Sequence, residues 1–86
     1  MTPTPALTLY SKPGCHLCDE MKHVIDAVRT RLPLTLDVVD ISTDPALMDQ
    51  YGLEIPVLLI DGKKAAKYRV GEEELEKRLK RTTGPA

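Results

Sequence analysis

The chain has 86 residues, of which 42% are hydrophobic, and a net charge of −1. A chain of this length forms one domain with a small core, and the hydrophobic share is that of a folded rather than a disordered chain. The near-zero charge argues against a nucleic-acid binder built on a basic face, and no apolar run approaches the ~20 residues of a membrane span. We expect a single domain over residues 1–86, with a core from about 6 to 81 and flexible tails at 1–5 and 82–86.

The first third of the chain predicts a strand followed by a helix. A short apolar strand is expected over Ala6–Ser11. From Cys15 to about Leu32, apolar residues recur at helical spacing. They are Leu17, Met21, Val24, Ile25, Val28 and Leu32. Pro33 cannot continue a helix, so we expect the helix to stop there.

The middle of the chain predicts a second strand and a short helix. The strand is expected over Leu34–Ile41, where apolar and polar residues alternate. Leu34, Leu36 and Val38 alternate with Thr35 and Asp37, and Val39 blurs the phase of the pattern. Asp44 is a typical N-cap, and Pro45 suits the first helical position. The helix should end near Tyr51, where Gly52 suits its last turn.

The last third predicts a hairpin and a final helix. Two strands, Val57–Ile60 and about Lys63–Arg69, are joined by Asp61-Gly62, a two-residue turn signal. The last helix opens at Gly71 and carries acidic residues early and basic residues late, which complements the helix dipole. The order is β-α-β-α-β-β-α. It predicts an α/β fold with a four-stranded mixed sheet flanked by helices, in which the first two strands are parallel.

The two cysteines, Cys15 and Cys18, stand where the first strand gives way to the first helix. The thiolate is the nucleophile in thiol–disulfide exchange, and a free cysteine with a pKa of ~8.5 is only about 3% ionised at pH 7. The unpaired N–H groups of a helix start would stabilise the thiolate of Cys15, which we therefore assign as the attacking sulfur. Cys18 lies one turn on, with its Cα about 5 Å away, and would resolve the mixed disulfide.

Neighbouring residues bear on the chemistry of the pair. Lys12 and His16 could add positive charge beside the first sulfur and contact a thiol substrate, although each is also compatible with an ordinary solvated residue. A structural zinc site needs about four ligands, and the only candidates besides the cysteines are His16 and His23. His16 would point elsewhere from a helix start and His23 lies over a turn past Cys18, so no metal site is expected. We expect His23 to be a surface residue. Haem attachment is excluded because Asp19, not histidine, follows the second cysteine.

The expected compartment is the cytoplasm, because Met1–Pro5 lacks the basic start and apolar stretch of a signal peptide. In the cytosol a lone Cys-x-x-Cys is more often catalytic or metal-binding than structural. A bridge that closes so short a loop would also constrain the unfolded chain very little.

The residues of Tyr10–Cys18 read Tyr-Ser-Lys-Pro-Gly-Cys-x-x-Cys, which resembles the active-site segment of glutaredoxins nearly letter for letter. Ile55-Pro56-Val57 matches their second signature, and Asp61-Gly62 matches their hairpin turn. The two signatures stand about 40 residues apart, as in that family. The resemblance covers roughly residues 6–81.

The resemblance implies a thioredoxin-like fold in which Val57–Ile60 runs antiparallel to Ala6–Ser11. It also implies a cis peptide bond before Pro56, facing the cysteine pair. Ile55 and Pro56 would then position the substrate. The Ile55 backbone could pair with an extended thiol substrate in the manner of an added strand.

The chain departs from glutaredoxins around the glutathione site. His16-Leu17 stands between the cysteines, where Pro-Tyr is usual. Val70-Gly71-Glu72-Glu73 keeps one glycine of the usual pair and puts two negative charges where a carboxylate would dock. Lys12 still matches the family's carboxylate-binding lysine, and Gln50 is a weaker match to a polar contact. We expect no bound cofactor, and glutathione is a candidate co-substrate only.

Two functions are compatible with the pair. The first is a dithiol–disulfide oxidoreductase, acting as a monomer on a disulfide-containing protein or a small-thiol substrate, with glutathione or a thioredoxin reductase system as reductant. The second is a soft-metal binding module or metallochaperone that holds Cu(I) or Zn(II) between two thiolates. Small metallochaperones usually have methionine two residues before the first cysteine, where this chain has Pro13, and follow the order βαββαβ. The sequence therefore favours the enzyme.

Overall fold

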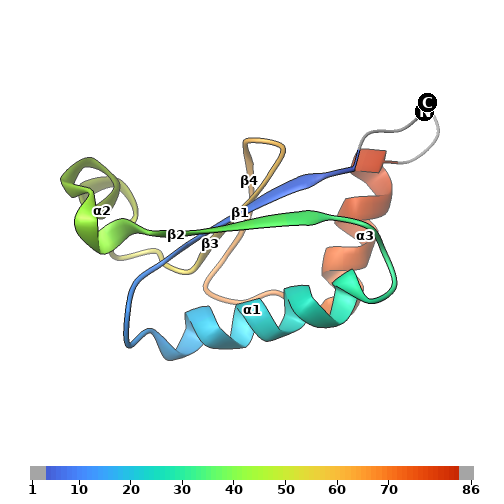
Figure 1. The fold of residues 1–86 in the computed structure, drawn as a ribbon, viewed down its shortest axis with the longest axis horizontal. Helices are drawn as coiled ribbons and strands as arrows, with labels where there is room; N and C mark the ends of the chain where they lie inside the picture. The colour runs from blue at the N-terminus through green and yellow to red at the C-terminus, as the bar shows by residue number, and fades with distance from the viewer. Residues whose placement is uncertain (1–3, 84–86) are drawn as a thin grey trace.

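The computed structural model describes residues 4–83, which form a four-stranded sheet with three α-helices (Figure 1). The elements in chain order are β1 (Ala6–Ser11), α1 (His16–Arg29), β2 (Thr35–Asp40), the 3-10 helix η1 (Ile41–Thr43), α2 (Pro45–Tyr51), β3 (Val57–Ile60), β4 (Lys63–Lys67) and α3 (Glu72–Thr83). The predicted order is confirmed, with η1 inserted after β2. None of the helices in this part of the chain is long and apolar enough to cross a membrane.

Strand β1 lies inside the sheet, whose order is β2-β1-β3-β4. It pairs in parallel with β2 and antiparallel with β3, and β3 pairs antiparallel with β4. The β1-α1-β2 unit is therefore the expected crossover. Figure 1 shows α1 and α3 together on one face of the sheet, while α2 lies at the end where β2 finishes. The predicted mixed sheet flanked by helices is confirmed.

The core lies between the sheet and the layer formed by α1 and α3. Leu7 and Leu9 of β1 are each 1% exposed and pair with Ile60 and Leu58 of β3. The helical residues of the same core include Met21, Ile25 and Val28 from α1 and Leu75 and Leu79 from α3. These side chains have no aromatic rings, as the absence of Phe and Trp predicts. Burying each one contributes about 1.5–3 kcal/mol.

The β3–β4 turn is the predicted two-residue hairpin loop. Asp61 and Gly62 both have positive φ, 51° and 83°, which is the conformation of a type I′ turn. Asp61 also ties the hairpin to the start of β1. Its N–H donates to the Ala6 carbonyl at 2.8 Å, and its Oδ1 accepts the Ala6 N–H at 2.9 Å.

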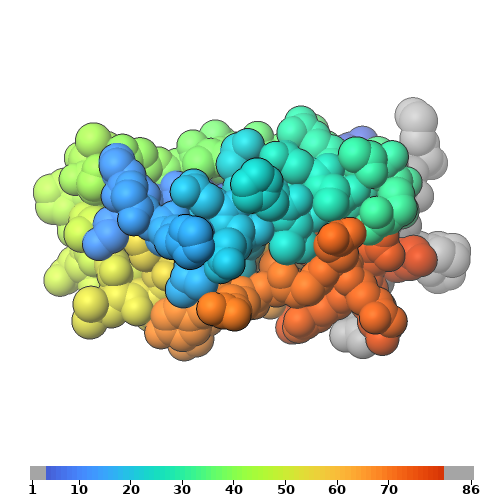
Figure 2. Space-filling model, turned by 90° about the horizontal axis from the view of Figure 1, so that it is seen from below, coloured from blue at the N-terminus to red at the C-terminus, as the bar shows by residue number. Residues whose placement is uncertain are grey.

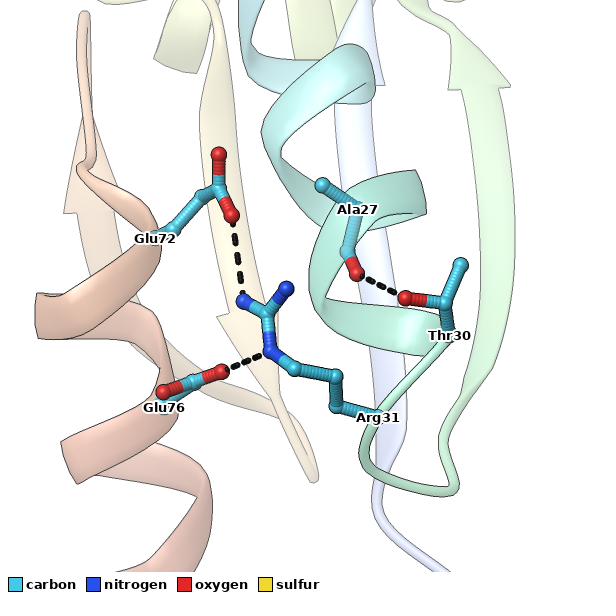
Figure 3. Close-up of polar contacts among 5 residues, drawn as sticks. All are labelled: Ala27, Thr30, Arg31, Glu72 and Glu76. Atoms are coloured by element: carbon cyan, nitrogen blue, oxygen red, sulfur yellow. Dashed lines mark hydrogen bonds and ion pairs between the residues drawn. The ribbon is translucent and has the colours of Figure 1, made fainter.

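Helix α1 ends earlier than predicted. Its last residue is Arg29, not Leu32. The Thr30 hydroxyl donates to the Ala27 carbonyl at 2.7 Å (Figure 3), and the N–H groups of the next two residues both donate to the Val28 carbonyl. Pro33 disfavours helical backbone at the residue before it, so the chain leaves the helix ahead of the proline rather than at it.

Strand β2 is also shorter than predicted, because Ile41 opens η1 instead of ending the strand. Asp40 Oδ1 accepts hydrogen bonds from the Ser42 hydroxyl at 2.6 Å and from the Ser42 N–H at 2.9 Å. Both bonds lower the pKa of Asp40, and the bond from the Ser42 hydroxyl has the larger effect. A side-chain oxygen that bonds the backbone two residues on turns the chain out of the sheet.

Strand β4 ends at Lys67 rather than Arg69 as predicted, because Tyr68 has a φ of 67°, outside the extended region. Val38, which continues the alternation of Leu34 and Leu36 along β2, is 44% exposed. β2 is an edge strand with a neighbour on one side only, so its residues are covered less completely.

The expected tails are shorter in the structure. Pro5 is buried, and its carbonyl accepts the Thr35 N–H at 3.0 Å, which extends the β1–β2 contact by one residue. Thr82 and Thr83 belong to α3. The rest of the two expected tails, residues 1–3 and 84–86, lies outside the described part of the chain.

Arg31 joins the end of α1 to the start of α3 (Figure 3). Its Nε lies 2.5 Å from Glu76 Oε1, and its Nη2 lies 3.0 Å from Glu72 Oε1. These hydrogen bonds, first with Glu76 and then with Glu72, raise the pKa of Arg31. A guanidinium that binds two carboxylates one helical turn apart fixes the rotation of α3 as well as its position.

We predict that Arg31→Met lowers the melting temperature at low ionic strength, because both carboxylates lose their partner while most of the alkyl chain is kept. The difference from wild type should narrow in about 1 M salt, where the Debye length falls to about 3 Å. Thermal unfolding at the two salt concentrations measures this. Arg29→Met, which changes a neighbouring arginine with no ion pair among the described residues, is the control. An R31M deficit that is unchanged by salt would show that packing, not charge, makes the contact.

Candidate active site

The loop from β1 to α1 brings the first cysteine to the start of the helix. Gly14 has a φ of 78°, which glycine adopts without strain. The Cys15 N–H donates to the Lys12 carbonyl at 3.3 Å and closes the turn. Cys15 is the N-cap of α1, with extended backbone, so its side chain stands beside the unpaired N–H groups of the first helical turn.

Cys15 and Cys18 form a disulfide with their Cα atoms 5.2 Å apart, close to the expected spacing. The Cys18 N–H donates to Cys15 Sγ at 3.1 Å, so the sulfur also caps the helix. The two residues differ in exposure: Cys18 is 4% exposed, whereas Cys15 is only partly buried. A reactant in solvent can therefore reach the first sulfur more readily than the second.

Lys12 and His16 lie on the surface around the disulfide. Lys12 is exposed, and the His16 side chain is 88% exposed with its Nε2 3.9 Å from Glu20 Oε1, one turn along α1. Within residues 4–83, neither side chain hydrogen-bonds to a sulfur. His23 is an exposed residue of α1, as predicted.

Ile55 and Pro56 come directly before β3, at the same end of the sheet as the disulfide. The peptide bond between them is cis, Pro56 is fully buried and Ile55 is half-buried. β3 starts opposite the end of β1, because Val57 pairs with Tyr10. The loop before β3 therefore lies at the same end of the sheet as the cysteine loop, which follows the last residue of β1.

A groove of about 190 Å³ runs beside the first two turns of α1. Its lining combines apolar side chains with one acid and one base: Leu17, Glu20, Met21, Val24, Tyr68, Arg69 and Val70. Figure 2 shows the segment after β4 beside the first half of α1 on this face. No motif in the sequence points to Tyr68 or Arg69 as site residues. Their place directly after the last strand is the only signal that could have found them.

The loop before Pro56 is fastened to β4. The Glu54 carboxylate lies 3.2 Å from Lys64 Nζ and 3.6 Å from Lys67 Nζ. The hydrogen bond from Lys64 is the main cause that lowers the pKa of Glu54. Nearby, the Tyr51 ring of α2 stacks on the Tyr10 ring of β1, with centroids 4.9 Å apart.

Three of the residues predicted to bear on a glutathione site have other partners in the structure. Glu72 pairs with Arg31, and Glu73 Oε1 lies 4.0 Å from Lys77 Nζ, so each predicted repulsive charge has a cationic partner. Gln50 Nε2 donates to the Tyr51 hydroxyl at 3.1 Å on the exposed side of α2. Across the described part of the chain, no group of three or more His, Cys, Asp or Glu side chains is placed to hold a metal ion.

Comparison with known proteins gives a consistent result. The family model of the Glutaredoxin-like domain (DUF836) matches residues 6–80. The Glutaredoxin-like protein YDR286C homolog of Dictyostelium discoideum is 31% identical over 75 residues, which are 80% of this chain and 69% of that protein. The X-ray structure of target protein XcR50 from X. campestris has a TM-score of 0.75 at 31% identity and covers 87% of this chain and 96% of its own. A mutant thioredoxin from Halobacterium salinarum NRC-1 shares the fold, with a TM-score of 0.69 at 20% identity, over 95% of this chain and 77% of its own.

The Glu54 contact predicts a pH dependence. A carboxyl group whose pKa is lower in the folded state stabilises that state above its unfolded pKa, and this contribution is lost as the pH falls through the folded value. Glu54→Gln should therefore lower the melting temperature near pH 7 and converge with wild type on acidification below the ordinary glutamate range. Thermal unfolding as a function of pH measures this.

The matched control is Glu74→Gln, which changes a carboxylate with no ion-pair partner among the side chains of residues 4–80. Its melting temperature should follow wild type through the same acidic range. An E54Q curve parallel to wild type at every pH would show that the Lys64 contact adds no stability.

Proposed function

Because the chain belongs to the Glutaredoxin-like domain family, we propose that it is a thiol–disulfide oxidoreductase acting through Cys15 and Cys18. The observation that carries the proposal is the asymmetry of the pair. One sulfur is reachable at a helix start, and the other is buried one turn behind it. Thiol–disulfide exchange needs one sulfur that meets the substrate and another that meets only the first.

In the first step the dithiol form uses Cys15. The N-terminal end of α1 favours its thiolate, which attacks one sulfur of the substrate disulfide. A bond forms between Cys15 Sγ and that sulfur, the substrate S–S bond breaks, and the other substrate sulfur leaves as a thiolate that takes a proton. The product is a mixed disulfide between the protein and half of the substrate.

In the second step Cys18 resolves the mixed disulfide. Its sulfur loses a proton, attacks Cys15 Sγ and forms the intramolecular bond, and the second substrate sulfur leaves as a thiol. The substrate has gained two electrons and two protons, and the protein is in the disulfide form described above. The 5.2 Å between the two Cα atoms lies within the range that a disulfide spans.

We assign substrate positioning to Ile55 and Pro56, which come directly before β3 and therefore lie near the end of β1. Lys12 and His16 are exposed beside the reacting sulfur. They would add positive charge there and attract an incoming thiolate or carboxylate. A thiol or dithiol reductant must return two electrons to close the cycle. Glutathione and a thioredoxin reductase system are the two candidates. The partner is a disulfide-containing protein or a small-thiol compound.

We predict that Cys15→Ser lowers disulfide reduction by at least roughly 10³-fold, because the nucleophile is gone. Cys18→Ser keeps the nucleophile but loses the resolving sulfur, so it should accumulate a mixed disulfide through Cys15. Turnover with a dithiol reductant and intact-protein mass under non-reducing conditions measure both effects.

The two single variants are each other's matched control, because both remove one sulfur and both lose the intramolecular bond. A Cys15→Ser protein that retains turnover, or a Cys18→Ser protein that traps no substrate, would contradict the assigned roles. A wild-type protein that reduces no disulfide but binds one Cu(I) through both thiolates would favour the soft-metal alternative.

A further inference from the structure

We propose that the substrates are protein segments in which a bulky apolar side chain flanks the reacting cysteine, selected by Leu17, Leu53 and Tyr68. These three residues are named the apolar strip. The inference rests on the proposed thiol–disulfide exchange and adds to it the class of substrate and the residues that recognise it.

The strip contains two of the large hydrophobic residues that the fold leaves in solvent. Within residues 4–83 the exposed ones are Val38, Leu53 and Tyr68, at 44%, 96% and 43%. A single exposed apolar residue is ordinary on a protein surface. Leu53 and Tyr68, however, are 15 residues apart in sequence and meet in space, because the Tyr68 hydroxyl donates to the Leu53 carbonyl at 3.4 Å. Folding therefore brings Leu53 and Tyr68, two exposed residues with large apolar side chains, next to each other on the surface.

The backbone that carries Leu53 is held in place. The next residue, Glu54, donates its N–H to the Tyr51 carbonyl at 2.8 Å, and its carboxylate binds Lys64 and Lys67 of β4. A side chain displayed on a fixed backbone loses less conformational freedom on binding than one on a mobile loop. The 96% exposure of Leu53 is thus a property of an anchored loop.

The strip continues to the disulfide. The Tyr68 N–H donates to the Pro56 carbonyl at 2.9 Å, which places Tyr68 against the loop before β3. Tyr68 also lines the groove beside α1, and so does Leu17, which stands between the two cysteines. Figure 2 shows these parts of the chain on one face: the start of α1, the segment after β4 and the loop before β3. A chain bound at Cys15 would lie over this face.

The size of the groove decides between a polypeptide and a small ligand. Its volume of about 190 Å³ is below the ~300–1,000 Å³ of pockets that enclose small molecules. A hollow of this size takes one side chain. Glutathione consists of γ-glutamyl, cysteinyl and glycyl groups and offers no apolar side chain to fill it. A protein segment with leucine or a similar residue beside its cysteine offers one.

The test uses two peptide disulfides that are identical except at the residues on both sides of the cysteine, which are leucine in one and serine in the other. Wild-type protein should reduce the leucine peptide with a kcat/KM higher by roughly three- to tenfold, because a buried apolar contact is gained. Tyr68→Ser should bring this ratio close to one, because Tyr68 lines the groove, and Leu53→Ser should lower it as well. Because Leu53 is almost fully exposed, L53S should unfold at the wild-type temperature.

Val38→Ser is the matched control, because Val38 is exposed on the edge strand β2, on the opposite side of β1 from β3 and β4. It should keep the wild-type ratio. Equal rates of wild type on the two peptides, or a preference that survives both strip variants, would overturn the inference. So would faster reduction of a glutathione mixed disulfide than of either peptide. If the wild type reduces none of the three, the proposed function itself fails, which is a separate result.

Discussion

Cys15 Sγ caps the N-terminus of helix α1, and the candidate site depends on that contact. The sulfur accepts the Cys18 N–H at 3.1 Å and is covalently bonded to the same residue. The geometry requires β1 to end before the loop and Gly14 to adopt its positive φ. The β1-α1-β2 crossover then packs α1 onto the sheet, so the helix that carries the sulfur is anchored by Met21, Ile25 and Val28 in the core. The reactive end of the helix stays at the surface while its apolar stripe is buried.

The second half of the chain supplies what faces the disulfide. β3 runs antiparallel to β1, so it starts where β1 ends. The loop with Ile55 and Pro56 therefore lies at the same end of the sheet as the disulfide. Glu54 fastens that loop to β4 through two lysines, and Tyr68 fastens the end of β4 back to Pro56. These contacts connect residues far apart in sequence. They turn two loops and a helix start into one surface.

The sequence predicts the elements and the cysteine pair well, because each has a local cause. Periodicity locates α1, Asp44-Pro45 marks the start of α2, and Asp61-Gly62 sets the hairpin turn, whose two positive φ angles need those residue types. What it misses depends on tertiary neighbours. Val38 has the alternation of a core residue but lies on an edge strand. Glu72 suggests repulsion when considered alone, yet it binds Arg31, 41 residues away.

The candidate site likewise has one part that the sequence predicts and one part that it does not. The motif around Cys15 and Cys18 identifies the chemistry, because spacing and helix position are encoded together. The exposure of Leu53 and the turn at Tyr68 follow from how the α2–β3 loop and β4 meet, and no local pattern reports them. Substrate selection is therefore the part of the site that required the three-dimensional structure.

The proposed chemistry requires Cys15 and Cys18 to form a reversible two-electron couple. The direct measurement equilibrates the protein with mixtures of reduced and oxidised dithiothreitol, starting from each form, then alkylates the free thiols and counts them by mass. We predict one transition between zero and two free thiols, identical from both directions, with a slope of about 30 mV per tenfold change in the protein's oxidised-to-reduced ratio. A disulfide that stays intact across the range, thiols that never re-form the bond, or a slope of about 59 mV, as for a one-electron couple, would contradict it.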